Sequence, residues 1–165
     1  RRVLFRSNLT ALLRQLYKRK YEKVAAKPPK KTNQIFVAMM FSDEMDDFYD
    51  QAYKPVAEDM GYTAMRIDRK DYTGLIIEEI EADIKNSIAV IADLTGNRGG
   101  VYYEAGIARG LQLCNHPLKL ILTCKKDFFE NEGVHFDLRG DNILIYQDIN
   151  ELKEKLRKRL ETVLV

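Results

Sequence analysis

The sequence predicts an α/β fold in which helices cover both faces of a five-stranded parallel sheet. From Gln34 onward, short apolar runs of strand length alternate with longer segments of helical periodicity. Most of the short runs are apolar at consecutive positions, as expected for strands that are covered on both faces. The chain has 165 residues, of which 45% are hydrophobic and 32% charged, a composition typical of one soluble globular domain.

Five strands are expected, at residues 34–39, 62–67, 87–93, 118–124 and 142–147. Strict alternation of strands and helices implies parallel strands joined by right-handed crossovers. For five such strands the common solution is the flavodoxin-like order 2-1-3-4-5. We therefore predict a doubly wound, flavodoxin-like domain at residues 34–165.

Helices are expected between the strands. The first runs over residues 44–60 and should kink at Pro55, because proline removes a helix hydrogen bond. The second runs over residues 74–85, the third begins near Gly100, and the last begins at a capping box of Asp148 and Glu151. The second helix is expected to turn four apolar side chains inward: Ile76, Ile77, Ile80 and Ile84.

The N-terminal segment is predicted to lie outside this domain. Residues 1–7, RRVLFRS, match an in-frame translation of a common short-read sequencing adapter, so we interpret them as an artefact. Residues 8–33 are predicted to form a basic amphipathic helix and a linker that starts at the prolines of KPPKKTN. Two interpretations of this helix stay open. It contacts a partner, a membrane surface or a nucleic acid, or it is the tail of a truncated upstream domain or packs on the α/β domain.

Charge is distributed unevenly along the chain. Residues 1–31 contain eleven Lys or Arg and one acid, so the other residues hold 16 basic and 24 acidic side chains, a net charge of −8. Polyanion binding is therefore expected only from the N-terminal arm. No apolar run approaches the roughly 20 residues that span a bilayer, and no signal peptide is recognisable, so a cytoplasmic protein is expected. Cys114 and Cys124 lack metal-ligand spacing, and we expect buried thiols, no metal site and no cofactor.

Glu104 is an acid within an otherwise apolar helix face. Spacings of three, four and seven place it beside Ile107, Ala108 and Leu111. One interpretation is an acid in the first turn that complements the helix dipole, worth about 0.3–1 kcal/mol. The other is a carboxylate held between apolar side chains and helix amides, which makes a useful nucleophile. The spacing alone leaves both open.

The loop before this helix is rich in glycine. In open α/β sheets ligands bind outside the carboxyl ends of the strands, which selects the loops at 40–43, 68–73 and 94–100. In the last loop, Gly99 and Gly100 allow close backbone approach at a helix start, where free amides can hold an anion. Asn97 and Arg98 stand beside them, and we predict that these four residues bind substrate. The alternative is that the glycines only turn the chain, since the loop matches neither the P-loop nor the dinucleotide fingerprint.

Four stretches of the sequence resemble a known family. FVAMMF, GYTAMRID, IAVIADLTGN and GVYYEAGIA are similar to the nucleoside 2-deoxyribosyltransferase family and its nucleotide N-glycosidase relatives, over roughly residues 34–147. The best match is the pattern G-x-x-x-E-x-G-x-A, which falls on Gly100, Glu104, Gly106 and Ala108. The resemblance implies that Glu104 attacks the anomeric carbon of a (deoxy)ribosyl group in a nucleoside or nucleotide. It also implies a homo-oligomer, because family members commonly complete their sites with a neighbouring subunit.

Four more side chains are candidates at the same edge of the sheet. Asp93, at the end of the third strand, matches a position that the family often keeps acidic or polar, and Asp68 follows the second strand. Either acid can protonate or hold the departing base, or can instead organise its own loop. Ser42 can bind a sugar hydroxyl or phosphate, or cap the next helix. Tyr102 can line a base pocket or belong to the core.

One departure from the family, one further loop and two other functions are also expected from the sequence. LTGNRG is more basic than the matching loop of transferases that act on neutral nucleosides, which favours a phosphorylated or dinucleotide substrate. FDLRG at residues 136–140 is a candidate recognition or interface loop, or its Asp137 and Arg139 form a surface pair. One alternative function is a TIR-like NAD-cleaving effector, although the Ser and Trp-Cys signature expected before the glutamate is missing. The other is a non-catalytic nucleotide-sensing module.

Overall fold

The structure is a computed structural model that describes residues 32–71 and 75–164. Its contacts divide the chain into two units, residues 1–30 and residues 31–165, and the first lies outside the described residues. The expectations for residues 1–31, namely the adapter artefact and the basic helix, therefore stay predictions.

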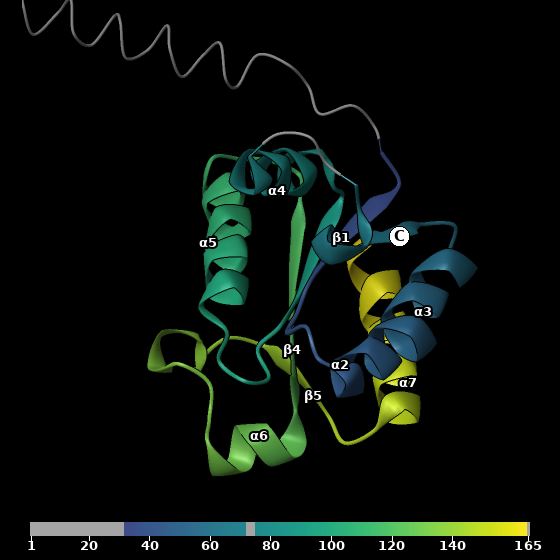
Figure 1. Ribbon diagram of the computed structural model, residues 1–165, viewed down its shortest axis with the longest axis vertical. Helices are drawn as coiled ribbons and strands as arrows, with labels where there is room; N and C mark the ends of the chain where they lie inside the picture. Colours follow the sequence, from purple (N-terminus) through teal and green to yellow (C-terminus); the bar gives the residue numbers. More distant parts are fainter. Residues whose placement is uncertain (1–31, 72–74, 165) are drawn as a thin grey trace, which may run out of the picture. The chain divides into compact units, whose positions relative to one another are not determined.

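A five-stranded parallel sheet forms the centre of the described unit (Figure 1). Its order is β2-β1-β3-β4-β5, which confirms the predicted flavodoxin-like topology. The register places Phe36 beside Val90 and Ile91 beside Ile121, so the middle of the sheet is apolar on both faces. The strands are β1 (Gln34–Ala38), β2 (Thr63–Met65), β3 (Ala89–Asp93), β4 (Lys119–Lys125) and β5 (Ile143–Tyr146).

Helices cover both faces of the sheet and form two separate apolar cores (Figure 1). One face carries α2 (Asp43–Phe48), the π-helical turn η1 (Tyr49–Tyr53), α3 (Lys54–Asp59) and α7 (Ile149–Leu164). The other face carries α4 (Ile76–Asn86) and α5 (Gly99–Leu113). Side chains alternate along a strand, so β3 sends Ala89 and Ile91 to the first core and Val90 and Ala92 to the second.

The first predicted helix forms as one run of helical turns over residues 43–59, but its hydrogen-bonding pattern changes along the run. Pro55 has no backbone N–H, and the residues before it adopt the wider π-helical turn η1. Within this turn the Lys54 N–H donates to the carbonyl of Tyr49, five residues earlier. The expected disturbance at Pro55 is thus a change of helix type that begins one turn earlier.

The start of α4 differs from the prediction. Ile80 and Ile84 are buried as expected, but Ile76 and Ile77 are 46% and 40% exposed. They occupy the first turn of the helix, which begins at Ile76. Ile76 lines a pocket instead of packing in the core.

The connection between β4 and β5 is short. It consists of α6 (Lys126–Asn131), which continues directly from the end of β4, and the 3₁₀ turn η3 (Phe136–Leu138). Neither element has the length of α4 or α5, and in Figure 1 α6 lies beyond the carboxyl end of the sheet. Part of the β4 face beside α5 is therefore covered only by the loop that contains η3.

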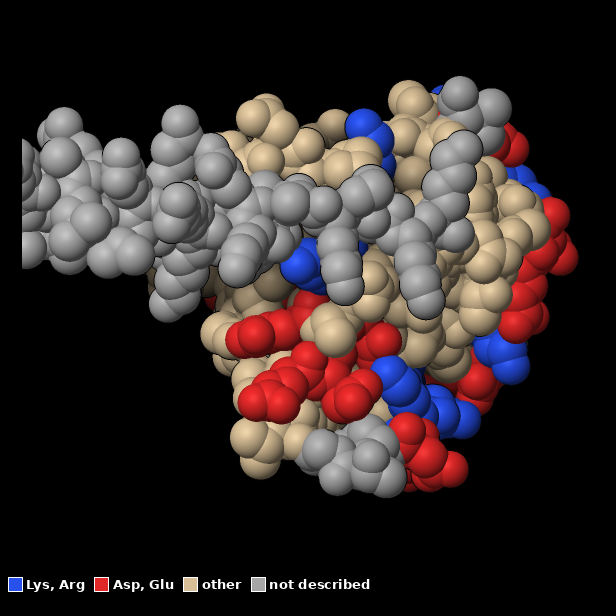
Figure 2. Space-filling view, turned by 90° about the horizontal axis from the view of Figure 1, so that it is seen from above, with Lys and Arg blue, Asp and Glu red and all other residues tan. Residues whose placement is uncertain are grey.

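The surface of the described unit is mixed in charge. Figure 2 shows acidic side chains gathered on the face seen from above, with basic side chains between them. None of the described helices is long and apolar enough to cross a membrane. Cys124 is buried as expected, whereas Cys114 follows the last turn of α5 and is exposed, so the prediction of two buried thiols is wrong for Cys114.

Candidate active site

A pocket of about 400 Å³ opens at the carboxyl ends of β1 and β3, where the chain order reverses. Its walls come from the segment after β1, the start of α4 and the first turns of α5. We call it the Glu104 pocket. Its lining residues are Met39, Met40, Phe41, Ile67, Ile76, Ile80, Asn97, Arg98, Gly99, Gly100, Val101 and Glu104.

Glu104 is the acid among these lining residues. It lies in the second turn of α5, is 9% exposed, and forms no hydrogen bond or ion pair with any residue of the described ranges. Burial among apolar side chains raises the pKa of Glu104 from 4.5 to about 7. A carboxylate with this pKa changes protonation near neutral pH and is free to act on a ligand as a base or a nucleophile.

The loop between β3 and α5 shapes the pocket floor. Gly96 has φ +79°, and a Cβ atom there would lie 2.8 Å from Sδ of Met40, so this tight turn requires glycine. Asn97 follows at φ 48°, and Arg98 takes the N-cap position of α5. Gly99 and Gly100, the first residues of α5, line the pocket together with the exposed Arg98, and the N–H groups of a first helical turn are free to bind an anion.

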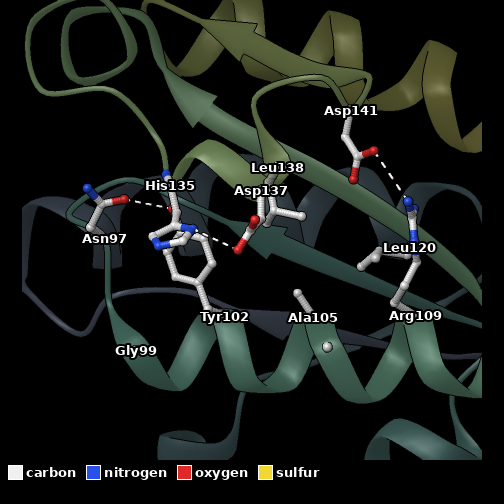
Figure 3. A pocket seen from close by; sticks show the side chains of 11 residues that line it. Asn97, Gly99, Tyr102, Ala105, Arg109, Leu120, His135, Asp137, Leu138 and Asp141 are labelled. Atoms are coloured by element: carbon white, nitrogen blue, oxygen red, sulfur yellow. Dashed lines mark hydrogen bonds and ion pairs between the residues drawn. The ribbon is translucent and has the colours of Figure 1, made fainter.

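Tyr102 lies outside the Glu104 pocket. Its hydroxyl donates to Oδ1 of Asn97 at 2.7 Å and accepts from the backbone N–H of His135 at 3.0 Å. It lines a second cavity of about 590 Å³ between α5 and the η3 loop, which we call the α5–η3 cavity (Figure 3). Asn97 and Gly99 line both cavities, so the two flank the start of α5.

Asp93 is fully buried and does not line the Glu104 pocket. Its Oδ2 accepts from the hydroxyls of Tyr53 at 2.5 Å, Tyr146 at 2.7 Å and Thr123 at 2.9 Å, and its Oδ1 accepts from the Thr95 N–H at 3.0 Å. The strand alternation explains this placement, because Asp93 has the parity of Ala89 and Ile91 and points to the face opposite α5. The sequence analysis expected Asp93 at the same site as Glu104. The structure does not bring the two residues together.

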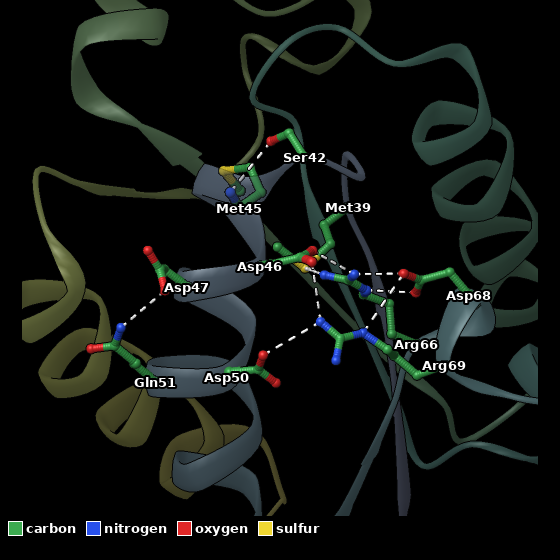
Figure 4. A network of polar contacts seen from close by, with 10 residues as sticks. All are labelled: Met39, Ser42, Met45, Asp46, Asp47, Asp50, Gln51, Arg66, Asp68 and Arg69. Carbon is green, nitrogen blue, oxygen red and sulfur yellow. Dashed lines mark hydrogen bonds and ion pairs between the residues drawn. The ribbon is translucent and has the colours of Figure 1, made fainter.

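Asp68 is also engaged by protein groups (Figure 4). Arg66, which is 1% exposed, donates from Nε to Oδ1 of Asp68 at 2.6 Å and from Nη2 to Oδ2 at 2.5 Å. The same guanidinium donates to Asp46 at 2.6 Å and lowers the pKa of that carboxyl. Asp68 does not line the Glu104 pocket. It helps to hold the end of β2 against α2, which is the loop-organising role that the sequence left open.

Ser42 caps α2. Its Oγ accepts a hydrogen bond from the Met45 N–H at 3.3 Å, and its backbone is extended, as is usual at an N-cap. It does not line the Glu104 pocket. Of the nine predicted site residues, the pocket brings together Glu104, Asn97, Arg98, Gly99 and Gly100.

Phe41 is a pocket residue that the sequence analysis did not single out. Its ring is 56% exposed and lies with its centroid 5.3 Å from Cζ of the buried Arg66. The signal was present in the sequence, since Phe41 follows the apolar run of β1 directly and lies in a loop at the carboxyl edge of the sheet. The His, Cys, Asp and Glu residues of the described ranges form no group that could hold a metal ion.

Comparison with known proteins adds a fold relationship. Neither a scan against models of protein families nor a search of curated proteins gives a match. Among solved structures, the chain is similar to a 2-desoxiribosyltransferase from Leishmania mexicana, with a TM-score of 0.53 and 18% sequence identity. The match covers 76% of this chain and 97% of that chain. At this identity the similarity shows the fold alone.

Proposed function

We propose that this protein cleaves or transfers the N-glycosidic bond of a nucleoside or nucleotide, with Glu104 as the nucleophile. The observation that carries the proposal is a carboxylate that is 9% exposed, has no protein partner in the described ranges and lines a pocket at the expected edge of the sheet. A buried acid without a partner costs stability, so its retention is best explained by a ligand. The fold shared with the desoxiribosyltransferase supports the same chemistry by analogy.

The chemical step uses the ionised form of Glu104. Its Oε atom attacks C1′, the C1′–N bond breaks, and the electron pair of that bond leaves with the base. Water or a second base then attacks C1′, the C1′–Oε bond breaks to release the carboxylate, and the proton lost by the attacking group goes to the departed base or to solvent. The transition state has oxocarbenium character, which the nearby negative charge stabilises.

The other pocket residues are assigned to binding. Arg98 and the amides that begin at Gly99 and Gly100 suit a phosphate or a sugar oxygen. The side chain of Asn97 holds the pocket edge in place, because its amide donates to the Gly133 carbonyl and accepts from the Tyr102 hydroxyl. We assign Asp93 and Asp68 a positioning role, because each is hydrogen-bonded inside the protein and neither lines the pocket.

Release of free base tests the proposal. The protein is incubated with deoxynucleosides, deoxynucleoside monophosphates and NAD, and free base is followed by chromatography for the wild type and Glu104→Gln. Glu154→Gln, at an exposed position of α7, is the matched control. We expect turnover of at least one substrate that Glu104→Gln abolishes and Glu154→Gln leaves unchanged. Tight binding of these compounds without turnover would contradict the proposal and favour a nucleotide sensor.

A further inference from the structure

The α5–η3 cavity has the size and lining of a small-molecule site (Figure 3). Its volume of about 590 Å³ lies within the range of roughly 300–1,000 Å³ that is typical of ligand pockets. The floor is apolar and comes from Ala105 and Gly106 of α5, Leu120 of β4 and Leu138 of η3. The cavity exists because the short connection between β4 and β5 places no long helix over this part of the sheet.

Aromatic rings form one wall of the cavity. Tyr102 is fixed by its two hydrogen bonds to Asn97 and His135, and the His135 ring packs edge-on to it with centroids 6.0 Å apart. Nδ1 of His135 is in turn 3.2 Å from Oδ2 of Asp137. A fixed aromatic wall beside an apolar floor favours a flat ring system over a flexible chain.

Asp141 gives the cavity hydrogen-bonding capacity that the protein does not use. Oδ1 accepts from Nη2 of Arg109 at 3.3 Å, whereas Oδ2 has no hydrogen-bond partner among the described residues and is shielded from solvent. Figure 3 shows the Asp141 carboxylate at the end of the cavity away from His135, with Oδ2 turned from Arg109. Rotation about the Cβ–Cγ bond is easy for a carboxylate and can turn either oxygen toward a ligand. A ligand N–H group would complete this site.

The two cavities lie on either side of the start of α5 and share two lining residues. Asn97 and Gly99 contribute to both, and Arg98 stands between these two residues at the N-terminus of the 15-residue helix α5. The partnerless carboxylate of Glu104 lies on one side of this helix start and the acceptor Asp141 lines the other cavity. The helix amides and Arg98 suit an anionic bridge between two ligand halves.

We infer that the α5–η3 cavity binds an amino-substituted planar base, and that this base is the second half of a dinucleotide whose reacting ribosyl group lies at Glu104. The second part of this inference rests on the proposed function. The composition of the Glu104 pocket agrees with it, because among the described residues no second acid lines that pocket to protonate a departing base. An N-glycosyl pyridinium needs no such acid: when the C1′–N bond breaks, the electron pair neutralises the ring nitrogen and no proton is taken up.

The test measures binding to the full chain carrying Glu104→Gln, which removes turnover. The probes are NAD, its purine analogue, in which a hydrogen atom replaces the adenine amino group, nicotinamide mononucleotide and AMP. Gly106→Leu fills the cavity, since a Cβ at Gly106 meets open space. Gly110→Leu, one turn further along α5 and also in open space, is the matched control because Gly110 does not line the cavity.

We expect NAD to bind at least tenfold more tightly than either mononucleotide. The purine analogue should bind at least fivefold more weakly than NAD. Gly106→Leu should weaken the binding of NAD at least tenfold and leave the affinity for nicotinamide mononucleotide within twofold of its value without this substitution. Gly110→Leu should change neither affinity.

Three results would overturn the inference. Equal binding of NAD and its purine analogue would remove the role of Asp141, and this comparison needs no substitution in the α5–η3 cavity. AMP binding as tight as NAD binding would show a separate mononucleotide ligand. No NAD binding, together with nucleoside turnover that requires Glu104, would reject the dinucleotide and leave the proposed function standing. Conversely, selective NAD binding with turnover unaffected by Glu104→Gln would reject the proposed function and keep the base cavity.

Discussion

Glu104 and Asp93 are both buried acids near the carboxyl end of β3, and their surroundings are opposite. Asp93 points to the face covered by η1 and α7, where three hydroxyls and one backbone N–H donate to it. Glu104 lies on the α5 side, among apolar residues, and no described residue donates to it. The two carboxylates lie near the same strand end, but their surroundings differ because they lie on opposite faces of the sheet.

The difference separates an acid that the protein uses as an acceptor from an acid that it does not. The acceptor capacity of Asp93 is used by the protein, so replacing it leaves buried hydroxyls without an acceptor. Glu104 accepts no hydrogen bond from the described residues, so burial of its charged form destabilises the folded chain. Replacing each acid should thus change different measurable quantities.

The largest expected effect is on turnover. Glu104→Gln should lower the rate of base release about 10³-fold or more, because an amide is not a nucleophile for C1′. Asp93→Asn keeps the shape and a carbonyl acceptor, and should leave the rate within about tenfold of the wild type. Initial rates on one substrate for both variants make the comparison. Equal losses in the two variants would show that the acids act together in the chemistry.

The next effect concerns stability. Asp93→Ala should lower the free energy of unfolding by about 3–5 kcal/mol, since the hydroxyls of Tyr53, Tyr146 and Thr123 lose their shared acceptor in the core. Urea unfolding at neutral pH measures this change. A loss below about 1 kcal/mol would mean that the three hydroxyls satisfy one another.

Replacing Glu104 should instead raise the free energy of unfolding, and only at pH values above the pKa that the residue has in the unfolded chain. Folding raises its pKa from 4.5 to about 7, so the folded state holds the proton more tightly and stability falls as the pH rises through this interval. That interval corresponds to about 3 kcal/mol. Glu104→Gln should therefore be about 3 kcal/mol more stable than the wild type at pH 8.5 and equal to it near pH 4. Urea unfolding of both proteins across this pH range measures the difference. A difference in unfolding free energy that does not change with pH would contradict the raised pKa of Glu104.

The smallest expected effect is at Ser42. Ser42→Ala removes the side-chain cap of α2 and should cost about 1 kcal/mol of unfolding free energy. KM for the substrate should not change, because Ser42 does not line the Glu104 pocket. Thermal unfolding and steady-state kinetics on the same preparation give both values. A rise in KM with no loss of stability would return Ser42 to the substrate-binding residues.

The sheet order could be predicted because it depends on a regular pattern of apolar runs and helical segments. Glu104 could be found because an acid on an apolar helix face after a glycine loop is a local signal, and the helix keeps that local geometry. The pocket residues that precede Glu104, from Asn97 to Gly100, lie in the same continuous segment and were found for the same reason.

Asp93 was misplaced for a physical reason. Its donors Tyr53, Thr123 and Tyr146 are 40, 30 and 53 residues away in the sequence. Because β3 is apolar on both faces, its sequence does not tell to which face Asp93 points. The α5–η3 cavity could not be predicted from the sequence either, because it depends on how much of the sheet the short connection after β4 leaves uncovered.

The central claim is tested most directly by trapping the sugar on the protein. A nucleoside with fluorine at C2′ slows both steps by destabilising the oxocarbenium-like transition states, so a glycosyl-enzyme accumulates. Digestion and mass spectrometry then locate the added sugar. We expect it on the peptide that contains Glu104 in the wild type and in Asp93→Asn, with none in Glu104→Gln. A sugar attached to another residue, or base released in the first turnover while Glu104 stays unmodified, would contradict the assignment of Glu104 as the nucleophile.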